Sequence, residues 1–154
     1  MMARVQTARG QRDSAMTWYR VALSMDPADS WSMNNLGLLL IEQGRYEESL
    51  GPLARAVELR PQSPAFANNL GIALERTGHP SEAAKSYRSA LAVDSTYTKA
   101  TNNLSLVESK MGSDTTTVDV SELAASFNQE LQTARQARRV AKSGTKPDSV
   151  KTPE

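Results

Sequence analysis

The sequence of 154 residues contains no cysteine and only one histidine, His79. Disulfide bonds, thiolate metal sites and cysteine nucleophiles are therefore excluded, and one imidazole cannot form a multi-histidine metal site. The glycines are spread along the chain, so a glycine-rich loop that holds phosphates is also missing. We expect neither a metal nor another cofactor, and we expect His79, which precedes Pro80, to cap a helix. These absences indicate that the chain is not an enzyme.

Aromatic residues make up only 5% of the chain, and the formal net charge is +1. Few aromatics with many alanines and leucines favour closely packed helices over a β-sheet. A charge near zero argues against a strong field for nucleic acid or anionic lipid. No apolar run approaches the ~20 residues that span a bilayer, and residues 1–10 lack the apolar core of a signal peptide. The expected location is the cytoplasm by default, or the periplasm if a signal peptide precedes Met1.

What the sequence does have is a repeat with a period of 34 residues. Several independent columns share this period: Gly10, Gly44, Gly78 and Gly112; Asn34-Asn35-Leu36, Asn68-Asn69-Leu70 and Asn102-Asn103-Leu104; Ala22, Ala56 and Ala90; and Pro27 and Pro61. A period of 34 with helical patterning is typical of two antiparallel helices per unit. One such pair cannot bury its apolar face alone, so adjacent units must stack.

Over residues 1–113 the sequence resembles the tetratricopeptide repeat family. The residues that carry the resemblance are Leu36-Gly37, Leu40, Gly44-Arg45-Tyr46, Ala56 and Pro61, and then Leu70-Gly71, Leu74, Gly78, Glu82-Ala83, Tyr87 and Ala90. The resemblance implies an all-α fold, a right-handed superhelical solenoid of helix-turn-helix repeats. The first repeat is incomplete, since residues 1–9 match only the later part of a first helix. Repeats at 30–63 and 64–97 follow, and 98–113 supplies a first helix only.

The residues themselves support helix pairs. Met33, Leu36, Gly37 and Leu40 share one helical stripe, and Gly44 supplies a left-handed residue that ends the helix. A second helix is predicted from Tyr46 to Leu59. An interior proline costs about 3 kcal/mol and removes one hydrogen bond, so Gly51-Pro52 predicts a kink in that helix. The flanking columns stay in register, so we do not expect a break.

The repeat pattern fails after Gly112. A polar loop at 113–118 is followed by a predicted helix at 119–142, with Asp119 as N-cap and Glu122 three residues later. Val120, Leu123, Phe127 and Leu131 recur at helical spacing. We expect this helix to cover the exposed apolar face of the last repeat as a cap, which solenoids need for solubility. Residues 143–154 have the composition of a disordered tail.

A basic run ends this helix, and it leaves two interpretations open. It comprises Arg135, Arg138, Arg139, Lys142 and Lys146, with no acidic residue before Asp148. One interpretation is a basic arm for nucleic acid or an acidic partner. The other is a solvated helix end whose cations suit the helix dipole. We favour the second, because no aromatic residues alternate with the basic ones to stack on bases.

Opposite the core stripe, each first helix carries a second stripe. In the resembling family this stripe lines a concave groove, which makes the candidate peptide-binding residues Asn35, Leu38, Glu42, Asn69, Ile72, Arg76, Lys99, Asn103, Leu106 and Lys110. Asn35, Asn69 and Asn103 would form a row of amides. That row is similar to the asparagines in the repeat domain of O-linked N-acetylglucosamine transferase, which grip peptide backbones. The alternative is that such asparagines bond a neighbouring helix, a role that we assign to Asn34, Asn68 and Asn102.

The predicted function is a scaffold that binds a peptide or protein partner in the concave groove. The alternative is a structural segment that self-associates through its open N-terminal repeat edge within a larger assembly. A dicarboxylate clamp, another mode of the resembling family, is not expected. Asn69 and Lys99 match it, but Asn103 stands at the arginine position and Asn34 at a lysine position.

Overall fold

The protein is seen in a computed structural model that describes residues 12–111 and 117–143. These residues form helices and contain no β-strand. The helices are α2 (Arg12–Met25), α3 (Ser30–Glu42), α4 (Tyr46–Leu59), α5 (Pro64–Arg76), α6 (Pro80–Val93), α7 (Thr98–Lys110) and α8 (Val120–Ser143). The predicted all-α helical repeat fold is confirmed. The predictions for residues 1–11, 112–116 and 144–154 lie outside the described residues.

Local sequence signals account for the helix ends. Asp29 caps α3 by accepting hydrogen bonds from the backbone N–H groups of Trp31 and Ser32. Gly44 ends α3 with a φ of 73°, and Gly78 ends α5 with a φ of 82°, the left-handed conformation that glycine adopts without strain. Each helix therefore ends where the 34-residue columns predict a turn.

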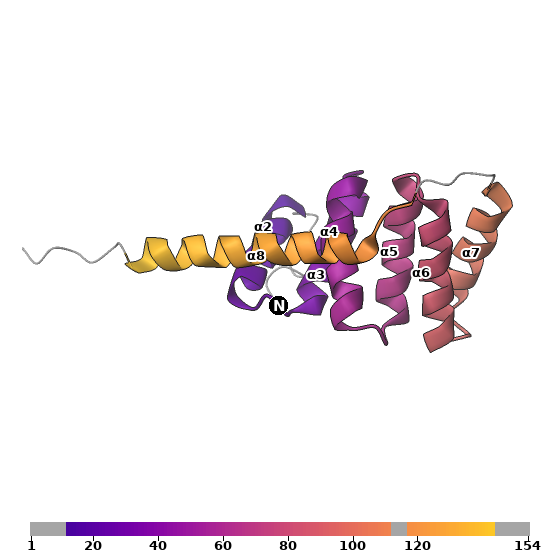
Figure 1. Cartoon of the computed structure of the whole chain (residues 1–154), viewed down its shortest axis with the longest axis horizontal. Coiled ribbons are helices and arrows are strands. Elements are labelled where there is room, and N and C mark those ends of the chain that lie inside the picture. Colours follow the sequence, from indigo (N-terminus) through magenta and orange to yellow (C-terminus); the bar gives the residue numbers. More distant parts are fainter. Residues whose placement is uncertain (1–11, 112–116, 144–154) are drawn as a thin grey trace, which may run out of the picture.

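Consecutive helices from α2 to α7 pack side by side and alternate between two layers (Figure 1). In one layer α3 contacts α5 and α5 contacts α7. In the other layer α4 contacts neither α2 nor α6 within the described chain. Because the first layer is the more closely spaced, the stack curves around α3, α5 and α7, whose free face is the concave one.

The core depends on two glycines at the crossings within each helix pair. A Cβ built on Gly37 would stand 2.4 Å from the Cγ of Leu53, and one built on Gly71 would stand 2.4 Å from the Cε1 of Tyr87. Leu53 and Tyr87 are completely buried. The large side chain of each second helix thus fills the space that the glycine of the first helix leaves.

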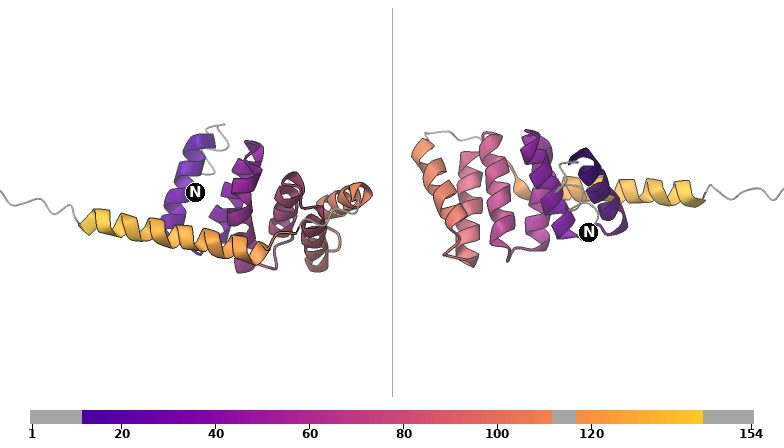
Figure 2. Two further views of the ribbon diagram at one scale, coloured as in Figure 1. Left: turned by 45° about the horizontal axis from the view of Figure 1, so that its top comes forward. Right: turned by 180° about the vertical axis from the view of Figure 1, so that it is seen from behind.

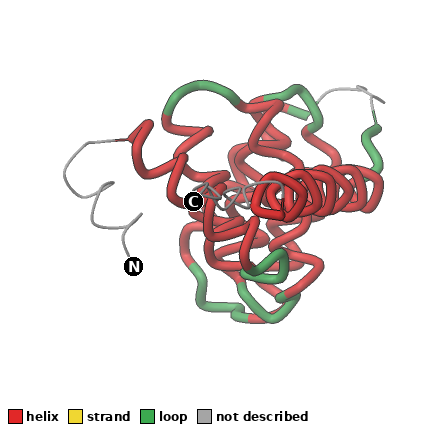
Figure 3. The backbone as a smooth tube through the Cα atoms, turned by 90° about the vertical axis from the view of Figure 1, so that its left-hand side faces the viewer, coloured by secondary structure: helices red, strands yellow, loops and turns green. Residues whose placement is uncertain are grey.

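The position predicted for the last helix is wrong. Instead of covering α7, α8 contacts α4 and α2 and crosses the outer layer of the stack (Figures 1 and 2). An end-on view places α8 to one side of the stacked helices (Figure 3). The cause lies in α7, where the core columns turn polar. Thr101, Ser105 and Glu108 replace the Met33, Gly37 and Leu40 of α3, and all three are exposed.

Polar residues on α7 remove the need for a cap there. Glu108 forms an ion pair with Arg88 of α6, which further suits this face to water. The apolar stripe of α8 is buried against the first described helices instead: Ala124, Phe127 and Leu131 are each less than a tenth exposed. Asp119 does cap this helix as predicted, accepting from the N–H groups of Ser121 and Glu122. Helix α4 continues without a break through the buried Pro52.

Candidate functional site

The predicted groove residues lie on the first-layer helices α3, α5 and α7. None of the ten is buried, and α8 lies on the outer layer, away from them. The half-buried members are Asn35, Leu38, Asn69, Ile72 and Asn103, and the exposed ones are Glu42, Arg76, Lys99, Leu106 and Lys110. We call the surface formed by these ten residues the groove face. It is available to a partner on three adjacent helices.

Two amide hydrogen bonds connect the repeats along this face. The Nδ2 of Asn69 donates to the Oδ1 of Asn34 at 2.8 Å, and the Nδ2 of Asn103 donates to the Oδ1 of Asn68 at 3.0 Å. The acceptors Asn34 and Asn68 are buried, whereas the donors are half-buried. Each bond therefore connects a groove amide to a buried amide of the preceding repeat and fixes the orientation of both.

The structural role predicted for the buried asparagine column is thus confirmed for Asn34 and Asn68. It is wrong for Asn102, which is exposed and forms no hydrogen bond within the described chain. The reason is that no described helix follows α7 on that side to supply a donor. Asn35, at the other end of the groove row, likewise has no hydrogen bond among the described residues.

Charges are unevenly distributed over the groove face. Glu42 lies on α3, whereas Arg76 lies on α5 and Lys99 and Lys110 lie on α7. The guanidinium carbon of Arg76 stands 5.8 Å from the centre of the Tyr46 ring, a cation–π distance that holds this side chain in place. The face is therefore more basic towards its α7 end.

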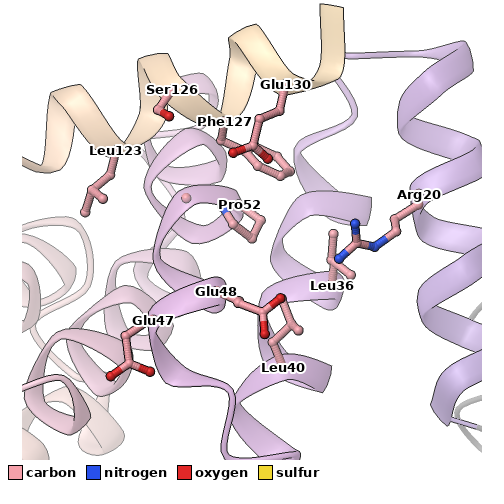
Figure 4. A pocket seen from close by; sticks show the side chains of 11 residues that line it. Arg20, Leu36, Leu40, Glu47, Glu48, Pro52, Leu123, Ser126, Phe127 and Glu130 are labelled. Carbon is pink, nitrogen blue, oxygen red and sulfur yellow. The ribbon is translucent and has the colours of Figure 1, made fainter. Parts of the chain in front are cut away.

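Sequence reasoning missed a cavity beneath α8, of about 300 Å³ (Figure 4). Leu36, Leu40, Pro52 and Phe127 contribute apolar walls, and charged side chains at its edge are Arg20, Glu47, Glu48 and Glu130. The pKa of Glu48 is lowered, chiefly because Arg45 donates two hydrogen bonds of 2.6 Å to its carboxylate. The cavity is not predictable from the repeat pattern, because it exists only once α8 lies over α4.

Chemistry-bearing groups are sparse in the described residues. Within 12–111 and 117–143 no group of three or more His, Asp or Glu side chains could hold a metal ion, and no helix is long and apolar enough to cross a membrane. His79 occupies the N-cap position of α6, but its side chain makes no capping hydrogen bond. The prediction that this residue caps the helix is therefore right for its backbone position only.

Comparisons with known proteins point in one direction. Residues 34–98 match a family model described as tetratricopeptide repeat. Human tetratricopeptide repeat protein 7B is 31% identical over 94 residues, which are 61% of this chain and 11% of that protein. The probable UDP-N-acetylglucosamine–peptide N-acetylglucosaminyltransferase SPINDLY of Hordeum vulgare is 26% identical over 110 residues, 71% of this chain and 12% of that protein. The chain thus spans only about a tenth of the length of these relatives.

A solved structure is similar in fold. It is the first repeat domain of Spaghetti (RPAP3) bound to the HSP90 peptide SRMEEVD. The TM-score is 0.69 at 19% sequence identity, and the match covers 71% of this chain and 86% of that one. At this identity the likeness shows the fold alone.

Proposed function

This chain carries tetratricopeptide repeats, and from that premise we propose that it is a scaffold that binds an extended peptide segment of a partner protein along the groove face. The partner lies across α3, α5 and α7, with its backbone on the row of Asn35, Asn69 and Asn103. Leu38, Ile72 and Leu106 provide apolar contacts beside this row. No step of this function requires catalysis.

The observation that carries the proposal is the fixed orientation of the groove amides. Each of Asn69 and Asn103 uses one N–H of its amide to bond the preceding repeat. An asparagine amide has two N–H donors and an acceptor oxygen, so one donor and the oxygen of each remain for a ligand. A side chain that is already held loses little conformational entropy on binding. Peptide N–H and C=O groups of a partner match such amides without regard to its side chains.

The charges of the groove face support a preference in the partner. Arg76, Lys99 and Lys110 give the α5 and α7 part of the face three positive charges, against the single carboxylate of Glu42 on α3. A peptide whose acidic residues lie at its α7 end would bind faster and more tightly, and the gain would fall as salt is added. We expect acidic residues at that end to be selected.

A peptide-bound structure of the same fold supports the general mode, since the repeat domain of Spaghetti holds an HSP90 peptide. We do not extend that ligand to this chain. Asn103 and Asn34 stand where the resembling clamp has an arginine and a lysine. The peptide SRMEEVD is therefore expected to bind this chain weakly, which makes it a negative control.

The experiment is selection of a random linear peptide library displayed on phage against the full chain. The selected peptides are then titrated against Asn35→Ala and against the Asn69→Ala/Asn103→Ala double variant. Because that double variant also loses the bonds between repeats, Asn34→Ala/Asn68→Ala is the matched control: it loses the same bonds and keeps the groove amides. Weaker binding of the groove variants with retained binding by the control supports the proposal. Equal affinity for all variants, with folding intact, would falsify it.

A second candidate function is self-association through α2. Trp18 and Met25 of this helix are 42% and 67% exposed, an apolar content that is high for a free surface. Stacking of α2 on another repeat edge would cover them. Light scattering over a range of protein concentrations tests this candidate. A monomer at all concentrations argues against it, and a Trp18→Gln variant should reduce any association that is seen.

A further inference from the structure

The cleft between the end of α2 and the last turns of α8 has an unusual charge pattern. It has a volume of about 210 Å³ and is lined by Ser24, Met25, Arg135, Arg138, Arg139 and Lys142. Four of these six side chains are basic, and no carboxylate lines the cleft. On α8 the four positions follow one another at intervals of three or four residues or are adjacent, so they lie on one side of the helix over about two turns, ~10 Å.

The other arginines of the described chain, where their side chains are placed, behave differently. Arg45, Arg55 and Arg88 form ion pairs with glutamates, and the charge of Arg20 acts on Glu48. Arg60 and Arg76 lie over aromatic rings. By contrast, Arg135, Arg138 and Arg139 form no ion pair and no ring contact within residues 12–111 and 117–143. The arginines of α8 are thus the exception in a chain that otherwise neutralises this residue.

One hydrogen bond orients the cluster. The Nη1 of Arg138 donates to the Oγ of Ser24 at 2.5 Å, which attaches α8 to the last turn of α2. The basic run is therefore not a frayed helix end, as its favoured interpretation supposes. Like charges placed together in one cleft repel each other, so the arrangement favours occupation by an anion.

We propose that this cleft binds a phosphate-bearing group. Guanidinium groups form paired hydrogen bonds with phosphate oxygens, and a phosphate carries up to two charges on three acceptor oxygens. Several cations without a carboxylate match that charge better than the single charge of a carboxylate ligand. This site is on the outer layer and is separate from the groove face, so it does not depend on the proposed peptide binding.

The phosphate-bearing group has two possible sources, a free phosphate compound or a lipid headgroup. Met25 and Val140 are 67% and 65% exposed, and they line this cleft and the adjoining surface of α8. Apolar side chains beside cations also occur where a protein lies on an anionic bilayer. The experiment therefore needs a probe for each source.

The test is calorimetric titration of the full chain with pyrophosphate, and separately with phosphatidylcholine vesicles that do or do not contain a phosphoinositide, at about 0.15 M salt. The informative variant is Arg135→Gln/Arg139→Gln, because neither side chain makes a hydrogen bond within the described chain. The control is Lys99→Gln/Lys110→Gln, which removes the same charge from the groove face. We expect at least about a tenfold loss of affinity in the first variant and less than about a twofold change in the second.

Each outcome decides the proposal. Binding of pyrophosphate that is lost only in the α8 variant supports it with a free ligand, and binding confined to phosphoinositide vesicles supports it with a lipid source. If neither probe binds, or if both variants weaken binding equally, the site is refuted and only net charge acts. A single-stranded RNA oligonucleotide is a further probe. Binding of RNA without either other probe would overturn the proposal in favour of a nucleic-acid surface.

Discussion

Phe127 of α8 lies directly against Gly51 of α4. A Cβ built on Gly51 would stand 3.1 Å from the Cβ of Phe127, closer than most real contacts. The next residue, Pro52, is buried and lines the same cavity as Phe127 (Figure 4). Glycine and proline are poor residues for a helix interior, yet here they leave α4 without a long side chain at the point where α8 crosses it. The departure from helix propensity is therefore explained by a tertiary contact.

The first prediction concerns this contact. Phe127→Ala should lower the free energy of unfolding by about 3–5 kcal/mol, since Phe127 is only 9% exposed and its loss leaves a cavity between α8 and α4. Urea denaturation measures the change. Gln129→Ala, on the exposed side of α8, is the control and should remain within about 0.5 kcal/mol of the original chain. Equal stability of the two variants would show that α8 does not depend on Phe127.

The second prediction tests the glycine column at the helix crossings. Gly71→Ala should destabilise the chain by about 1–3 kcal/mol, because the added methyl group overlaps the ring of the buried Tyr87. Ser105 occupies the same column on α7, where it is exposed. Ser105→Ala should therefore change the stability by less than about 0.5 kcal/mol. Thermal unfolding of the two variants distinguishes a packing effect from a general effect of the column.

These contrasts show how far the sequence predicts the fold. The repeat columns predict the helices and turns, because Gly37, Gly44 and Gly71 have local or neighbouring-helix roles that recur every 34 residues. The position of α8 was not predicted, since it lies outside the repeat and its contacts are far away in sequence. Two signals were nevertheless present: the polar Ser105 and Glu108 on α7, which make a cap unnecessary, and Gly51-Pro52 on α4.

The candidate site shows the same division. Helical periodicity correctly separates Asn35 from the buried stripe, because the angle between residues on a helix is fixed. Periodicity cannot predict that Asn69 bonds to Asn34, as this requires the distance between repeats. Nor does it predict the cleft of Arg135, Arg138 and Arg139 with Ser24, which depends on where α8 packs.

The third prediction concerns the amide bonds between repeats. Asn68→Ala should cost about 1–3 kcal/mol of stability, since Asn68 is buried and its loss leaves the Nδ2 of Asn103 without its acceptor. Asn102→Ala removes the equivalent side chain on α7, where it is exposed and unbonded within the described residues, and should cost less than about 0.5 kcal/mol. Chemical denaturation of both variants is the measurement. A similar loss in both would mean that the hydrogen bond contributes nothing.

The last prediction is a loss of stability at alkaline pH through Tyr87. Burial raises the pKa of this fully buried phenol well above its ordinary value near 10, and the negative charge of Glu75, which accepts a hydrogen bond of 3.1 Å from its hydroxyl, raises it further. Above about pH 10 the unfolded chain releases this proton while the folded chain retains it, so the unfolded state binds fewer protons. The contribution of Tyr87 to stability is therefore complete below about pH 10 and falls by up to about 1.4 kcal/mol per pH unit above it.

Tyr87→Phe separates this effect from general alkaline unfolding. The variant should lose about 1 kcal/mol near neutral pH, because the bond to Glu75 is missing, but its stability should decline less steeply above about pH 10. A smaller decline should remain, since burial also raises the pKa of Tyr97. Urea unfolding at several pH values between about 8 and 11 gives both slopes. If the two proteins lose stability in parallel across that range, the Tyr87 proton is not coupled to folding, and the alkaline limit of this chain must come from other groups.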